Sequence, residues 1–205
     1  MLIFLDAGLA YLATPKTGTT AIENALRSHA DIVFAGQGKH MTARRFQRRI
    51  APFVEKTFGV RLESVAVMRD PLDQLQSWYR YRAGDRQKGT DRSTADMSFD
   101  AFLRDVLSDS PPPHADIGNQ LRFLNVGRDG ASVDHLFAYE SPDALCAFLS
   151  DKLGTRIVTE RHNVSPRVDA TVSVEMEQRL RRARAADFAL HRRLVAAGGY
   201  LRGTS

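Results

Sequence analysis

Residues 14–20 (TPKTGTT) have the residue types of an anion-binding loop. They follow the apolar run 9–13, which predicts a strand, and they precede a helical pattern over residues 19–29. Gly18 lets the backbone come close to an anion, and the N–H groups at the helix start point toward that anion. Lys16 adds a full positive charge, and hydroxyl donors come from Thr17, Thr19 and Thr20. The stretch therefore predicts a site for phosphate or sulfate.

The order of residues in this loop differs from the common nucleotide-binding P-loop. That motif places its lysine directly after the second of two glycines. Here Lys16 comes two residues before Gly18, and the earlier glycine is missing from its expected place. The loop therefore indicates anion binding without indicating the usual Walker motif.

Two further polar clusters follow predicted strands. Lys39 and His40 come after the apolar segment 31–35, and Arg69 follows the apolar segment 65–68. In open α/β sheets, ligands bind outside the carboxyl ends of the strands. We therefore expect these clusters to lie near the loop that contains Lys16.

Arg69 and Ser77 predict a second anion site. A guanidinium group can grip a phosphate through two parallel hydrogen bonds. Asp70 is a favourable helix N-cap and Pro71 suits the first helical position, so Ser77 falls about two turns into the next helix. Arg69 can instead form a structural ion pair, and Ser77 can face solvent.

The alternation of apolar strands and amphipathic helices predicts the fold class. We expect an α/β, three-layer fold with a central, mostly parallel sheet flanked by helices, in a single domain over residues 1–205. Beyond the segments named above, we expect strands at 2–5 and 134–139 and a long loop at 84–97. A helix from Thr42 to about 57 should carry Phe46, Ile50, Phe53 and Val54 on its apolar stripe. Further helices are expected from Pro71 to about Arg82, after Ser98, at 114–124 (a short one), at 141–153 and from Ser173 to about Ala197.

Composition limits the class of protein. The chain has 205 residues, 43% hydrophobic and 26% charged, which is ordinary for one globular domain. Its net charge of +5 suits an anionic ligand, nucleic acid or a membrane surface. The single cysteine, Cys146, cannot form an internal disulfide, and we expect it to be buried and inert. The N-terminal segment lacks a basic stretch before its short apolar run, so we expect a cytoplasmic protein with no transmembrane segment.

The order Pro-Lys-Thr-Gly-Thr-Thr, together with Arg69-Asp70-Pro71 and the later Ser77, resembles the sulfotransferases that use PAPS (3′-phosphoadenosine 5′-phosphosulfate). The two segments cover residues 10–26 and 63–81, a minority of the chain. The resemblance implies a P-loop-like fold that transfers a sulfuryl group from PAPS to an acceptor hydroxyl, or to an amine, and releases PAP (3′-phosphoadenosine 5′-phosphate). It assigns the 5′ end of PAPS to Lys16, Thr17, Gly18, Thr19 and Thr20, and the 3′-phosphate to Arg69 and Ser77.

The resemblance also implies catalytic roles. Many members of this family place a histidine after the strand between the two motifs, and His40 occupies that position. His40 is therefore assigned as the general base that takes the proton of the acceptor, with Lys16 stabilising the leaving phosphate. Lys39 can also meet the sulfate, but the favoured interpretation is a solvated surface side chain. No metal is expected, and the acceptor can be a small molecule or a glycan.

Two other functions fit parts of the sequence. A nucleotide kinase or NTPase that uses ATP and magnesium would need an acidic residue at a strand end, and Asp70 is the candidate. A non-catalytic protein that binds nucleic acid or an acidic polymer would rely on arginines, for which the run of Arg179, Arg181, Arg182 and Arg184 is available. We favour a solvated helix face for that run. Arg161 and Arg167, in a late basic loop, can close over the nucleotide, and we make no assignment there.

Overall fold

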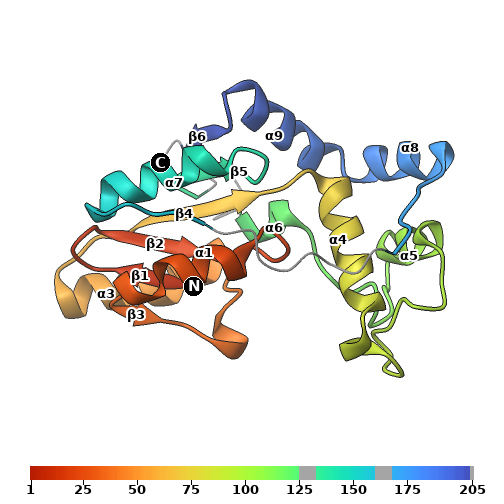
Figure 1. The fold of residues 1–205 in the computed structure, drawn as a ribbon, viewed down its shortest axis with the longest axis horizontal. Coiled ribbons are helices and arrows are strands. Elements are labelled where there is room, and N and C mark those ends of the chain that lie inside the picture. The colour runs from red at the N-terminus through yellow and green to blue at the C-terminus, as the bar shows by residue number, and fades with distance from the viewer. Residues whose placement is uncertain (125–132, 160–167, 204–205) are drawn as a thin grey trace. The chain divides into compact units, whose positions relative to one another are not determined.

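The structure is a computed structural model that describes residues 1–124, 133–159 and 168–203. It is an α/β structure, as the sequence predicts, and the chain divides into two compact units that we describe separately (Figure 1). Unit 1 contains the sheet and consists of Met1–Arg69, Gln120–His162 and His191–Ser205. Unit 2 is mainly helical and consists of Asp70–Asn119 and Asn163–Leu190.

The described part of unit 1 forms one six-stranded sheet in the order β3-β1-β2-β4-β5-β6. The strands are β1 (Leu2–Phe4), β2 (Leu9–Leu12), β3 (Ile32–Val33), β4 (Glu63–Met68), β5 (His135–Ala138) and β6 (Tyr200–Arg202). β2, β4 and β5 are parallel neighbours, with Leu12 opposite Ala66 and Val67 opposite Phe137. β1 is antiparallel to both β2 and β3, and β6 is antiparallel to β5.

The prediction of a mostly parallel sheet is therefore wrong. Of the five strand pairings in the observed sheet, two are parallel and three are antiparallel. β1 and β2 are joined by a short turn with Gly8 at φ 58°, and such a turn can only join antiparallel strands. β2, β3, β4 and β5 nevertheless point the same way, because β2 and β3 both pair antiparallel with β1. Their carboxyl ends share one edge of the sheet, as the sequence argument requires.

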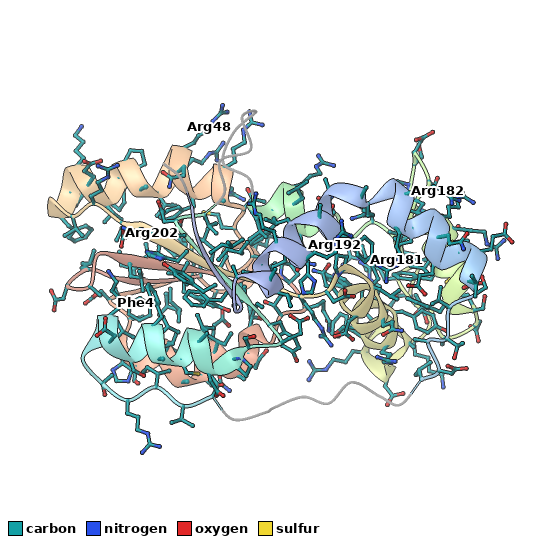
Figure 2. All side chains as sticks on the ribbon, turned by 90° about the horizontal axis from the view of Figure 1, so that it is seen from above. Phe4, Arg48, Arg181, Arg182, Arg192 and Arg202 are labelled. Atoms are coloured by element: carbon teal, nitrogen blue, oxygen red, sulfur yellow. The ribbon has the colours of Figure 1, made fainter. Side chains whose placement is uncertain are left out.

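One face of this sheet is covered by two helices. α1 (Thr19–Leu26) contributes Ile22 and Leu26 to the main apolar cluster, and α7 (Pro142–Leu153) contributes Leu145 and Leu149. These side chains pack on alternate residues of the strands, which are Leu2, Phe4, Leu9, Tyr11, Ala13, Val65, Val67 and Phe137. Figure 2 shows α3 on the other side of the sheet from α7.

The helix predicted after Thr42 forms, but it contains a wider turn. α2 (Ala43–Arg45) leads into a π-helical turn (Phe46–Ile50) and then into α3 (Ala51–Phe58), and the Thr42 hydroxyl accepts a hydrogen bond from the Arg45 N–H at 3.3 Å. Phe46 and Val54 are buried as predicted. Phe53 was expected on the same apolar stripe but is 56% exposed. A π turn holds more residues than an α turn, so it rotates the later residues and turns Phe53 toward solvent.

Unit 2 is built around α4 (Pro71–Ala83), which begins and ends close to the predicted residues. The Asp70 carboxylate accepts hydrogen bonds from the N–H groups of Leu72 and Asp73 at 2.9 and 3.0 Å, which confirms its role as N-cap. α5 (Phe99–Val106), capped by Ser98, and α8 (Val174–Ala183), capped by Ser173, complete the unit. Their apolar cluster contains Leu75, Tyr79, Phe99, Phe102, Leu103, Val106, Met176, Leu180 and Phe188.

Two predicted helices differ from the structure, and one strand was not predicted. The helix expected over residues 114–124 is only α6 (Gln120–Leu124), since residues 112–116 form a turn closed on the Pro112 carbonyl. The final helix is divided at Arg184 into α8 and α9 (Ala185–Ala196). β6 was not predicted, because it is a three-residue edge strand that follows two glycines with positive φ.

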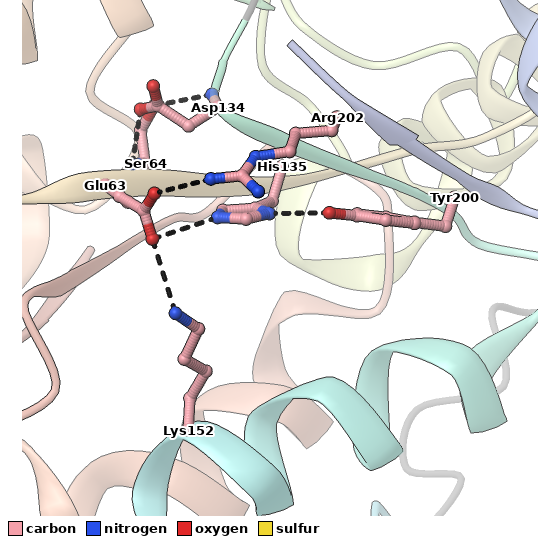
Figure 3. Close-up of polar contacts among 7 residues, drawn as sticks. All are labelled: Glu63, Ser64, Asp134, His135, Lys152, Tyr200 and Arg202. Carbon is pink, nitrogen blue, oxygen red and sulfur yellow. Dashed lines mark hydrogen bonds and ion pairs between the residues drawn. The ribbon is translucent and has the colours of Figure 1, made fainter.

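A polar network joins β4, β5 and β6 at the amino ends of β4 and β5, away from residues 14–20 (Figure 3). His135 is 3% exposed; its Nε2 lies 3.2 Å from a Glu63 carboxylate oxygen and its Nδ1 lies 2.9 Å from the Tyr200 hydroxyl. The carboxylate can only accept, so Nε2 donates to Glu63 and Nδ1 accepts from Tyr200. Lys152 and Arg202 also contact Glu63, each at 3.4 Å. Burial acts to raise the pKa of Glu63, but the hydrogen bonds and charges of His135 and Lys152 outweigh it and lower this pKa.

We predict that Tyr200→Phe lowers the free energy of unfolding by about 1–2 kcal/mol, because it leaves the buried Nδ1 of His135 without a donor. Urea denaturation followed by circular dichroism measures this change. Arg202→Gln is the matched control in the same network; its side chain is 72% exposed, so it changes stability by less than about 0.5 kcal/mol. Equal effects of the two variants would contradict the assigned hydrogen bond.

Candidate functional site

Residues 14–18 form a tight turn between β2 and α1, as predicted, and Thr19 and Thr20 begin α1. Gly18 is the N-cap of α1 with φ 70°, and no side chain caps this helix. The N–H groups of Thr19 and Thr20 lie in the first turn, where a helix offers no internal acceptor. Thr17 is fully buried, and its hydroxyl donates to the Thr14 carbonyl at 2.9 Å. Thr17 therefore stabilises the turn through its side chain, and it can meet an anion through its backbone N–H.

Gly18 is required at its position for two reasons. Its φ of 70° is in the left-handed region that side chains disfavour. A Cβ atom there would also lie 3.1 Å from Cε2 of Tyr139, which follows β5. The loop therefore approaches the Tyr139 ring as closely as a glycine allows.

Lys16 has a strained backbone and a side chain whose pKa is lowered. Its φ is 66°, and it is the non-glycine residue with positive φ in the described chain; such a conformation costs about 1–3 kcal/mol and is common at functional sites. Burial, and then the nearby positive charge of Arg69, lower the pKa of Lys16 to about 8. An anion bound beside the ammonium group would raise this pKa again, because a nearby negative charge favours the charged form of lysine.

Arg69 is held at the end of β4 by its backbone and its side chain. The Gln120 side chain, 1% exposed, accepts from the Arg69 N–H at 2.9 Å and donates to the Arg69 carbonyl at 2.8 Å. The guanidinium group donates to the Lys16 carbonyl at 3.1 Å and lies over the Tyr139 ring, 4.4 Å from its centre. The structure therefore brings Arg69 and the loop around Lys16 together.

His40 lies next to the same loop. Its Nδ1 is 2.7 Å from the carbonyl oxygen of Ala13, the residue that leads from β2 into the turn. A carbonyl can only accept, so Nδ1 carries the proton and the lone pair of the neutral ring is on Nε2. Burial is the main cause that lowers the pKa of His40, and the positive charge of Lys39 adds to it. His40 is therefore neutral at pH 7 and can accept a proton at Nε2.

Lys39 is bound rather than solvated. Its ammonium group forms an ion pair with Glu23 of α1 at 2.6 Å. This ion pair ties the segment that contains His40 to the helix that follows the turn. The interpretation of Lys39 as a plain surface side chain is therefore wrong.

The remaining predicted residues are placed as follows. Ser77 belongs to unit 2, on α4, and is 8% exposed. Arg161 and Arg167 lie outside the described residues. Cys146 is half-buried, with its sulfur 3.7 Å from the Thr159 hydroxyl. Arg181 pairs with Glu177 at 2.7 Å, as expected for a charged helix face.

Sequence reasoning missed Gln120 and Tyr139 as parts of this site. Tyr139 ended a predicted strand, so the rule that polar residues at strand ends meet at one edge could have found it. Gln120 carried no such signal, because its contact with Arg69 joins residues 51 positions apart. A contact of this kind depends on the tertiary structure.

No group of three or more side chains suited to hold a metal ion occurs among the described residues. No helix in residues 1–124, 133–159 or 168–203 combines the length and apolar character needed to cross a membrane. A scan of protein-family models, a search of curated proteins and a search of solved structures each found no match to this chain.

The strain at Lys16 predicts a difference between two variants that both remove its charge. Lys16→Gly relaxes the positive φ and Lys16→Ala does not, so we expect Lys16→Gly to be more stable by about 1 kcal/mol. Thermal or urea denaturation of both variants measures this difference. If Lys16→Ala were the more stable variant, the backbone conformation assigned to this loop would be wrong.

Proposed function

We propose that this protein is a PAPS-dependent sulfotransferase that transfers a sulfuryl group to an acceptor hydroxyl, or to an amine, and releases PAP. The observation that carries the proposal is the meeting of Lys16 and Arg69 beside the uncapped start of α1, with His40 hydrogen-bonded at the same strand end. A P-loop-like, three-layer, single-domain fold is part of the proposal, as is a cytoplasmic location.

The charges of the loop support an anionic ligand. Two cations are held together, and burial, followed by the positive charge of Arg69, lowers the pKa of Lys16. Such an arrangement is unfavourable in the protein alone and becomes favourable when phosphate or sulfate oxygens lie between the cations and the helix N-terminus. Gly18 fits the same ligand, because it lets the backbone N–H groups approach those oxygens.

In the proposed reaction, PAPS supplies a sulfuryl group on a good leaving phosphate. His40 Nε2 takes the proton of the acceptor hydroxyl as its oxygen attacks sulfur. Lys16 and the N–H groups of the first turn of α1 stabilise the negative charge that develops on the leaving oxygen. The Ala13 carbonyl keeps Nδ1 protonated, so the ring can only accept through Nε2. Ser77 is assigned to the 3′-phosphate, with Arg69, by the sequence pattern alone.

The alternative of an ATP- and magnesium-dependent kinase gains little support. Asp70, the acidic residue available at a strand end, uses its carboxylate to cap α4. A comparison of PAP with ATP plus magnesium therefore decides between the two proposals.

Calorimetric titration with PAP tests the nucleotide site. We expect binding without metal, and we expect Arg69→Gln to weaken it about 10- to 100-fold, as for loss of hydrogen bonds to a charged group. Arg61→Gln is the matched control, because it removes the same charge at an exposed position just before β4, at the opposite edge of the sheet. Absence of PAP binding, or preference for ATP with magnesium, would overturn the proposal.

The pH dependence of kcat/KM, which reports groups of the free enzyme, tests the catalytic roles. His40 must be neutral, so the rate should rise as pH increases through its pKa, which is lowered from 6.5. Lys16 must be protonated, so the rate should fall as pH passes its pKa of about 8. Release of PAP with a panel of phenolic and sugar acceptors provides the measurement.

Two variants isolate these limbs of the profile. Lys16→Arg should remove the fall near pH 8, because guanidinium stays protonated. His40→Gln should retain PAP affinity and reduce turnover by about 10²–10⁴-fold. Lys39→Gln, by contrast, should retain most of the turnover. Unchanged turnover in His40→Gln would remove His40 as the base.

A further inference from the structure

The helical segment 43–58 of unit 1 presents four arginines to solvent. Arg44, Arg45, Arg48 and Arg49 are all exposed, and we call them, with the exposed Phe53 and Phe58, the arginine face. Figure 2 shows Arg48 pointing away from the sheet. The segment contains five basic side chains and one acidic side chain, so this side of unit 1 is strongly positive.

The arginines follow the spacing of a helix surface. Arg44 and Arg48 are four residues apart, as are Arg45 and Arg49. The opposite side of the segment is fixed in the core by Phe46 and Val54, both fully buried. Within the described chain, none of the four arginines forms an ion pair or a hydrogen bond through its side chain. Their charges are therefore available to an external partner.

The same helical segment carries two exposed phenyl rings. Phe53 is 56% exposed and Phe58 is 47% exposed, and their ring centres are 6.4 Å apart at an angle of 84°. The π turn directs Phe53 to solvent, although the sequence pattern of an ordinary helix would bury it. Exposed aromatic rings on the same segment as several exposed arginines combine two ways to hold a membrane surface, since such rings can enter the acyl boundary and guanidinium groups can bind phosphates.

We propose that the arginine face docks on a bilayer of anionic phospholipids. Charge complementarity requires a negative partner, and the phenyl rings require an apolar layer behind that charge. The rings meet edge to face, so they do not form a flat platform on which nucleic-acid bases could stack. The lipid surface is therefore favoured over nucleic acid. The inference does not depend on the proposed nucleotide site.

Co-sedimentation of the full chain with phosphatidylglycerol-containing vesicles tests the proposal. We expect binding to these vesicles, no binding to pure phosphatidylcholine vesicles, and weaker binding as salt increases. Arg48→Gln with Arg49→Gln should weaken binding about thirty-fold, since each basic residue near such a surface contributes about a factor of five. Phe53→Ser with Phe58→Ser should weaken, by about ten-fold, the vesicle binding that persists at high salt.

The matched control is Arg179→Gln with Arg182→Gln, which makes the same change in net charge at exposed positions of α8 in unit 2. This control should retain vesicle binding. Circular dichroism of each variant verifies folding, which surface substitutions should leave intact. The proposal is overturned if anionic vesicles are not bound, if the control weakens binding as much as the arginine-face variant, or if the same arginines bind a single-stranded oligonucleotide more tightly than they bind anionic vesicles.

Discussion

The parallel pairing of β2 with β4 is the constraint on which the candidate site depends. It aligns Leu12 with Ala66, so the residues that follow the two strands lie at the same edge of the sheet. Arg69 then donates to the Lys16 carbonyl at 3.1 Å. Two positive side chains are kept close despite their repulsion, and this repulsion adds to the effect of burial in lowering the pKa of Lys16. Burial of Leu9–Leu12 and of most of Glu63–Met68 stabilises the pairing that imposes this proximity.

Several contacts hold this unfavourable arrangement in place. Gln120 fixes the Arg69 backbone on both its N–H and carbonyl sides, and the Tyr139 ring lies against the guanidinium group. The same ring limits the space at Gly18. The loop that contains Lys16 is therefore shaped by α6 and by residues that follow β4 and β5, and these contacts fix its backbone in the conformation that the proposed anion site needs. Preorganisation of this kind is what electrostatic catalysis requires.

The two ends of the parallel strands in unit 1 carry different groups of polar side chains. The carboxyl edge of β2, β3, β4 and β5 gathers cations and His40, whereas the amino edge of β4 and β5 is closed by the buried His135 and its partners. On the helical segment 43–58, core packing uses one side and leaves the arginines on the other. These separate surfaces explain how one small unit can combine a nucleotide site with a membrane-facing side, as we propose.

The sequence by itself determined the local elements and the residue types of the site. The turn at Gly18, the Asp70 cap and the order of the main strands and helices follow from short-range sterics and hydrogen bonding, which the local pattern carries. The antiparallel neighbours of β1, the edge strand β6, the π turn that exposes Phe53 and the contact of Gln120 with Arg69 were decided by the tertiary structure. Each of these depends on which distant segments pack together, and residues far apart in sequence leave no local pattern that reports it.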